Sequence, residues 1–179
     1  MNKLKSLCII TVFVTFTIFS QSKSPLYLDA SQPVELRLKD LMGRMTLEEK
    51  VYQMNQFVGL DHMRQAEKNL TEEELHSNDA QGFYKGLFSD DVAQMTKEGK
   101  IGSFLHVLTT EEANLLQQLA LQSPLKIPIL IGIDAIHGNA LVSGTTVYPS
   151  PITLASTWSD SFLYDVGKQS AKEMRATGS

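Results

Sequence analysis

One short stretch places an acid, a histidine and a glycine together after an apolar run. Asp134 follows the apolar residues 127–133, His137 comes three residues later, and Gly138 is next to it. A carboxylate accepts two hydrogen bonds at once, which suits the adjacent hydroxyl groups of a sugar. Aspartate is also common in turns, so the alternative interpretation is that Asp134 only caps the turn that follows it.

Metal binding is a second chemistry that this stretch could support. Asp134 and His137 would supply two ligands, whereas zinc sites use three or four. The other histidines show no ligand spacing: His62, His76 and His106. We therefore expect no metal and no cofactor. We expect His137 to be held in its loop by backbone hydrogen bonds, while Gly138 permits a backbone shape that other residues resist.

Other reaction classes lack their motifs. The chain has no G-x-S-x-G nucleophile turn, no phosphate-binding loop and no G-x-G-x-x-G. Its basic residues are dispersed, and its net charge is −4. A mildly acidic protein does not attract phosphate backbones or anionic membranes, so we expect no nucleic-acid partner. A neutral or cationic substrate fits this charge better.

The elements around Asp134 follow a strand–helix–strand pattern. Residues 101–107 form a short apolar run, and Thr109 and Glu112 are typical of a capped helix start. Residues 127–133 are apolar without alternation, which predicts a parallel strand buried on both faces. Ligands bind at the carboxyl ends of strands in β/α folds, so Asp134 is predicted to lie at the rim of a site.

Further helices are predicted from caps and apolar spacing. They cover residues 33–45, residues 46 to about 56, residues 89–99, and residues 159 to about 176. Trp158, the one tryptophan, could stack on a sugar, but its place beside a helix start favours a core position. Two parallel strands are far fewer than the eight of a closed (β/α)₈ barrel. We therefore expect residues 23–179 to be an incomplete N-terminal portion of an α/β, TIM-like barrel domain.

The first 22 residues are typical of a secretory signal peptide. Lys3 and Lys5 precede an uncharged apolar stretch, and small residues allow cleavage after Ser22. The stretch is short for a membrane span, so we expect export to the periplasm or outside the cell, with no stable membrane anchor. Cys8 is the one cysteine and lies within this segment, so the mature chain can form no disulfide within itself.

Two segments of the sequence resemble a known family. RLKDLMGRMTLEEKVYQM, residues 37–54, is similar to the N-terminal entry segment of glycoside hydrolase family 3. IPILIGIDAIHGNALVSGTTVYPSPITLASTW, residues 127–158, is similar to the second-strand signature of its β-glucosidase branch. The N-acetylglucosaminidase branch tends to carry Asp-x-Glu-Gly-Gly at this place, which residues 134–138 do not match.

The resemblance implies a barrel followed by an α/β sandwich domain, with the active site where they meet. It implies retaining hydrolysis of terminal, non-reducing β-D-glycosyl residues, with a β-linked glucoside or oligosaccharide as substrate. Asp134 would bind hydroxyl groups of the sugar in the −1 subsite. The family's nucleophile and acid/base would lie beyond Ser179, so we expect this chain alone to be inactive and to need the missing remainder.

Two alternatives to a fragment of an enzyme remain open. The chain could be a truncated, non-catalytic module that binds sugar or another protein. It could also be a subunit that completes its barrel with a second chain.

Overall fold

The computed structural model describes residues 24–75, 84 and 86–179, in two compact units. The predicted signal peptide lies outside the described residues, as does His76. The first unit ends at Met45 and contains a 3₁₀ turn, η1 (Leu26–Leu28), and helix α2 (Val34–Arg44). Arg37 Nε donates to the carbonyl oxygen of Tyr27 over 2.9 Å and so joins the two elements. The predicted helix over this segment is confirmed.

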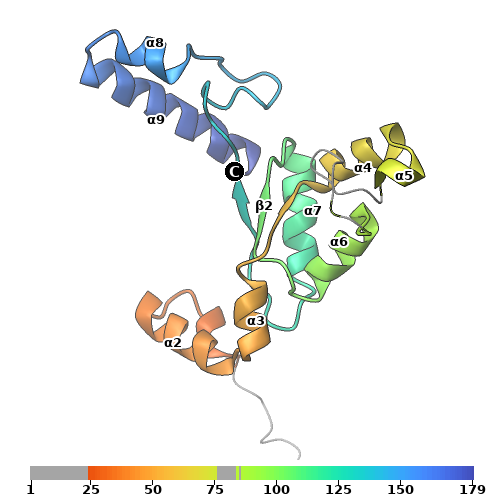
Figure 1. Ribbon diagram of the computed structural model, residues 1–179. Helices are drawn as coiled ribbons and strands as arrows, with labels where there is room; N and C mark the ends of the chain where they lie inside the picture. The colour runs from red at the N-terminus through yellow and green to blue at the C-terminus, as the bar shows by residue number, and fades with distance from the viewer. Residues whose placement is uncertain (1–23, 76–83, 85) are drawn as a thin grey trace, which may run out of the picture. The chain divides into compact units, whose positions relative to one another are not determined.

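The second unit, Thr46–Ser179, is built on a three-stranded parallel sheet (Figure 1). Its strands are β1 (Gln56–Val58), β2 (Ser103–Leu105) and β3 (Leu130–Gly132), in that order. Phe104 of β2 lies between Phe57 of β1 and Ile131 of β3 in the register. The two predicted parallel strands are therefore confirmed as neighbours, and the described fold is α/β.

Strand β1 was not predicted. The sequence predicts a helix from Thr46 to about Gln56, but α3 (Leu47–Tyr52) ends earlier and the chain then turns into β1. The capping box at its start is confirmed, with Thr46 Oγ1 accepting from the N–H of Glu49. Three residues are too few for alternation to show in a sequence. The family signature thus lies on the third strand of this sheet, not the second.

One face of the sheet is covered by helices (Figure 1). They are α4 (Leu60–Asn69), α6 (Ser89–Lys97) and α7 (Thr110–Ala120), and a short helix, α5 (Glu72–Leu75), follows α4. Phe104, Leu60 and Leu116 are fully buried where the sheet meets these helices. Burying one such side chain contributes about 1.5–3 kcal/mol.

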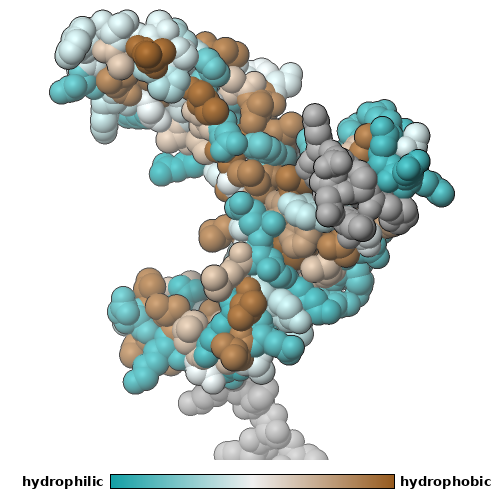
Figure 2. All heavy atoms as spheres, in the orientation of Figure 1, coloured by the Kyte–Doolittle hydropathy of each residue, from teal (hydrophilic) through white to brown (hydrophobic). Residues whose placement is uncertain are grey.

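Strand β3 is less buried than the sequence predicts. Leu130 is 75% exposed, and Ile131 and Gly132 are only partly buried. The expectation of burial on both faces is therefore wrong for the described chain, because nothing described here covers the second face of β3. Figure 2 shows hydrophobic side chains open on the surface in this part of the second unit.

The segment after β3 contains two helices joined by a turn. They are α8 (Pro151–Ala155) and α9 (Asp160–Thr177). The predicted cap of α9 is confirmed, since Ser159 Oγ accepts from the N–H of Phe162. Helix α8 was not predicted. Trp158, in the turn between them, is 94% exposed, so the expectation of a core position is wrong.

Candidate functional site

The carboxyl ends of β2 and β3 bring a histidine and an aspartate into contact. His106 directly follows β2, and Asp134 comes two residues after β3. The distance between His106 Nε2 and Asp134 Oδ2 is 3.0 Å. An ionised carboxylate can only accept, so the shared hydrogen belongs to the imidazole. The aspartate side chain is 60% exposed and the histidine side chain 29%, so the carboxylate is the outer member of the pair.

The parallel register positions this pair. Leu105 lies beside Gly132, and the N–H of His106 donates to the carbonyl oxygen of Gly132 over 2.9 Å. His106 then adopts a left-handed backbone with φ of 58°. Such a conformation is uncommon for residues other than glycine, although histidine, asparagine and aspartate adopt it more often than most. The chain therefore leaves β2 abruptly at the residue that contacts Asp134.

His137 lies in the loop after Asp134 but makes a different contact. Its Nδ1 is 2.9 Å from the carbonyl oxygen of Tyr148, and the N–H of Tyr148 donates to the carbonyl oxygen of His137 over 3.0 Å. Gly138 follows with φ of 71°, where an added Cβ would lie 2.6 Å from Tyr148 Cδ2. The two residues thus both lie against Tyr148, and no hydrogen bond described here joins His137 to Asp134.

The same loop is anchored to α9. Asn139 is fully buried, and its Nδ2 donates to Thr177 Oγ1 over 3.0 Å. Further along, the N–H and hydroxyl of Thr146 both donate to the carboxylate of Glu173. These hydrogen bonds, that of the hydroxyl foremost, lower the pKa of Glu173 below its usual value. The loop carrying Asp134 is thereby fixed at points after the acid.

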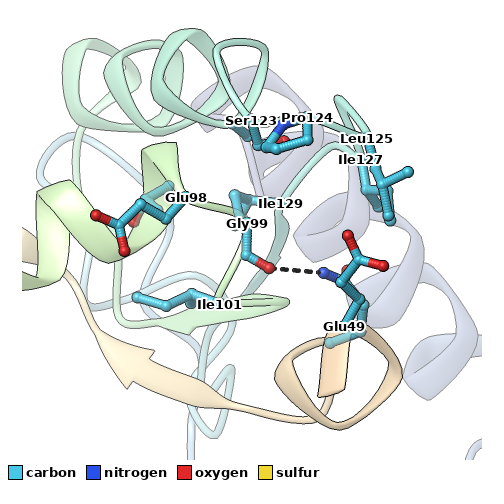
Figure 3. Close-up of a pocket in the computed structure, with 12 residues that line it drawn as sticks. Glu49, Glu98, Gly99, Ile101, Ser123, Pro124, Leu125, Ile127 and Ile129 are labelled. Atoms are coloured by element: carbon cyan, nitrogen blue, oxygen red, sulfur yellow. Dashed lines mark hydrogen bonds between the residues drawn. The ribbon is translucent and has the colours of Figure 1, made fainter. Parts of the chain in front are cut away.

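A small cavity lies at the other end of the strands (Figure 3). Ile101 and Ile129, which precede β2 and β3, line it, and Gln53 Nε2 donates across it to the carbonyl oxygen of Gly99. Its volume of about 10 Å³ admits roughly one water molecule. It is too small for a sugar, and it lies away from the carboxyl ends of the strands, where β/α folds bind ligands.

His106 is the site residue that the sequence did not indicate. Its spacing from the other histidines suggests no ligand set, but it directly follows β2, just as Asp134 closely follows β3. The position of both residues just after a parallel strand is the feature of the sequence that could have indicated His106. Among the described residues, no group of three or more His, Cys, Asp or Glu side chains is arranged to hold a metal ion.

The sequence of the second unit matches a known family. Residues 46–179 match the glycosyl hydrolase family 3 N terminal domain, and the same range forms the second compact unit. The chain belongs to glycosyl hydrolase family 3.

Curated proteins similar to this chain carry glycosidase names. The periplasmic beta-glucosidase of Salmonella typhimurium is 27% identical over 141 residues, which cover 78% of this chain and 14% of that protein. Beta-glucosidase C of Emericella nidulans is 28% identical over 162 residues, which cover 86% of this chain and 24% of that protein. The beta-xylosidase of Formosa agariphila is 33% identical over 85 residues, which cover 44% of this chain and 12% of that protein. The chain thus spans about a quarter or less of the length of these relatives.

Proposed function

We propose that this chain is the N-terminal portion of an exported β-glucosidase-like enzyme. The complete enzyme would hydrolyse terminal, non-reducing β-D-glycosyl residues with retention of configuration. The chain would supply the first strands of a (β/α)₈ barrel and the sugar-binding Asp134. The nucleophile and the acid/base would come from the remainder of the enzyme, so the 179-residue chain alone would be inactive. Its membership of the family and the glucosidase names of its relatives support this proposal.

The observation that carries the proposal is the place of Asp134. The carboxylate lies at the carboxyl end of β3, is 60% exposed, and keeps Oδ1 available beside the bond from His106 to Oδ2. An exposed acceptor at the end of a parallel strand can bind hydroxyl groups of a sugar ring. Such bonds accelerate hydrolysis when they strengthen as the ring distorts toward its transition state.

Replacement of Asp134 tests this assignment. In the complete enzyme, we expect Asp134→Asn to lower kcat/KM on an aryl β-glucoside by more than about tenfold, as the loss of a charge-assisted hydrogen bond implies. Asp90→Asn is the matched control, since Asp90 is an exposed residue in the first turn of α6. Equal kinetics in both variants would show that Asp134 is only a turn residue.

The choice of sugar requires a panel of substrates. One relative is named a beta-xylosidase, so aryl glucosides, xylosides and arabinosides should be compared. Activity of the complete enzyme with inactivity of the 179-residue chain is the expected result. Sequencing the DNA after the Ser179 codon is the simplest further test, because an open reading frame that encodes the rest of the barrel is expected there.

Export is the remaining part of the proposal. The name of the Salmonella typhimurium relative contains the word periplasmic, and residues 1–22 have the pattern of a signal peptide. Within residues 24–75, 84 and 86–179, no helix is both long and apolar enough to cross a membrane. N-terminal sequencing of the mature protein should begin at Lys23, and an intact Met1 in the exported protein would contradict the proposal.

A further inference from the structure

We propose that His106 is a positioning residue that holds Asp134 in the orientation needed to bind a sugar. This inference rests on the proposed function, because it gives the histidine a purpose only if Asp134 binds the sugar. The juxtaposition that carries it is the 3.0 Å contact between His106 Nε2 and Asp134 Oδ2 at the carboxyl ends of two neighbouring strands.

The carboxylate depends on this contact for its orientation. Among the described residues, His106 is the one side chain recorded within hydrogen-bond distance of Asp134. An exposed aspartate side chain with no partner would sample several rotamers, and ordering it on binding would cost free energy. A preset orientation removes that cost, and Oδ1, which does not share in the 3.0 Å contact, is available to a ligand.

The histidine can perform this role because it is itself held. Its N–H is bonded to Gly132, two residues before Asp134, so backbone and side chain both join β2 to the β3 end. Its carbonyl oxygen lies close to Gly59 at the end of β1, where an added Cβ would be 2.9 Å away. The left-handed conformation of His106 is therefore enclosed by two neighbouring strands. Strained backbone of this kind is found at sites that need a fixed geometry.

The order of exposure distinguishes this pair from a hydrolytic dyad. In a dyad, a buried carboxylate orients an imidazole that faces the substrate. Here the relation is reversed, since the imidazole is 29% exposed and the carboxylate 60%. The carboxylate is therefore the member that faces the ligand, and the histidine is the support behind it.

A double-mutant cycle on the complete enzyme tests the inference. We expect His106→Asn to lower kcat/KM on an aryl β-glucoside by about tenfold, the loss of one hydrogen bond to a charged group. Asparagine tolerates the left-handed backbone but is too short to place a donor where Nε2 lies. Glutamine places an amide nitrogen near that point, so His106→Gln should keep kcat/KM within about threefold of the parent.

The cycle is completed in an Asp134→Ala background. If His106 acts through the carboxylate, His106→Asn should not lower kcat/KM further in the Asp134→Ala background. If His106 acts independently, the substitution should lower kcat/KM by the same factor in both backgrounds. The control is His62→Asn, an exposed histidine of α4, which should leave kcat/KM unchanged. Melting temperatures of all variants show whether a loss of activity reflects unfolding. His106→Gly serves as the second variant if asparagine unfolds the protein, because glycine adopts the left-handed backbone without steric cost.

The outcomes separate the two proposals. If Asp134→Ala leaves kcat/KM unchanged, the proposed function of Asp134 fails. If Asp134→Ala is impaired but the effect of His106→Asn is the same in both backgrounds, or the glutamine variant is as impaired as asparagine, the positioning role is overturned. In that case the sugar-binding assignment of Asp134 stands.

Discussion

The N–H of Asp61 donates to Glu112 Oε1 over 3.0 Å, so a side chain of α7 caps the start of α4. Helix α4 begins after Gly59, which has no side chain to perform this function. Glu112 is only 3% exposed, and burial raises the pKa of its carboxyl, while the bonds from the N–H groups of Asp61 and Leu60 oppose this rise. The chain therefore keeps a buried acid directly beneath the end of β1.

Removal of this cap should destabilise the protein. We expect Glu112→Ala to lower the free energy of unfolding by about 1–3 kcal/mol, because it leaves buried N–H groups without an acceptor. Urea denaturation measures the loss. Glu111→Ala is the control, since Glu111 is the exposed neighbour in the same turn of α7. Equal stability of the two variants would show that solvent replaces the cap.

The pH dependence of this site has a defined sign. Because the folded-state pKa of Glu112 is raised, the folded protein binds the proton more tightly than the unfolded chain. Its contribution to stability is therefore full below the unfolded-state pKa of 4.5 and declines as pH rises through the folded-state value. Glutamine does not titrate, so the stability of Glu112→Gln relative to wild type should increase as pH rises through the folded-state pKa of Glu112. A stability difference that stays constant across pH would show that the pKa of Glu112 is not raised by folding.

A third prediction concerns Gly102, which lies directly before β2. A Cβ at this position would lie 2.0 Å from the carbonyl oxygen of Gln53 and 2.6 Å from its carbonyl carbon. Backbone cannot move aside as a flexible side chain does, so Gly102→Ala should cost about 3 kcal/mol or more. Gly132→Ala is the matched control, because a Cβ there meets atoms only at 3.6 Å and beyond. Similar melting temperatures for the two variants would show that the segment before β2 adjusts freely.

The sequence predicted the features that depend on nearby residues. The caps at Thr46, Thr109 and Ser159 are confirmed because a hydroxyl and an N–H three residues apart interact within one turn. Strand β1 escaped prediction because, unlike β2 and β3, it does not lie within a longer apolar run, and it begins soon after the end of α3. The exposure of Leu130 escaped it because burial of a strand depends on what covers the sheet.

The candidate site likewise combines a residue that its sequence neighbours indicate with a contact that depends on residues far away in the sequence. Asp134 could be selected from the apolar run before it. Its contact with His106 could not, because it depends on the β2–β3 register and on a left-handed backbone 28 residues away. For Trp158, the residue type led to a wrong expectation of burial, because this usually buried residue lies exposed in the turn between α8 and α9.

The last prediction separates backbone strain from crowding in the loop that carries Asp134. Gly138 and Gly144 both have left-handed backbones, with φ of 71° and 86°. A Cβ at Gly144 would meet no atom within 4 Å, whereas one at Gly138 would lie 2.6 Å from Tyr148 Cδ2 and 3.0 Å from the carbonyl oxygen of Thr146. Alanine at Gly144 should therefore cost only the left-handed penalty, about 1–2 kcal/mol.

Alanine at Gly138 should cost that penalty and a further amount, about 1–3 kcal/mol, for displacing Tyr148 and Thr146. The carbonyl oxygen of Tyr148 contacts His137 Nδ1, and the N–H of Tyr148 donates to the carbonyl oxygen of His137. Displacement of Tyr148 should therefore reach the loop beside Asp134. In the complete enzyme, we expect Gly138→Ala to lower kcat/KM on an aryl β-glucoside by about tenfold at temperatures where the variant stays folded, while Gly144→Ala retains activity. If both variants lose equal stability and both keep full activity, Gly138 contributes only its backbone conformation, and the loop does not depend on its contact with Tyr148.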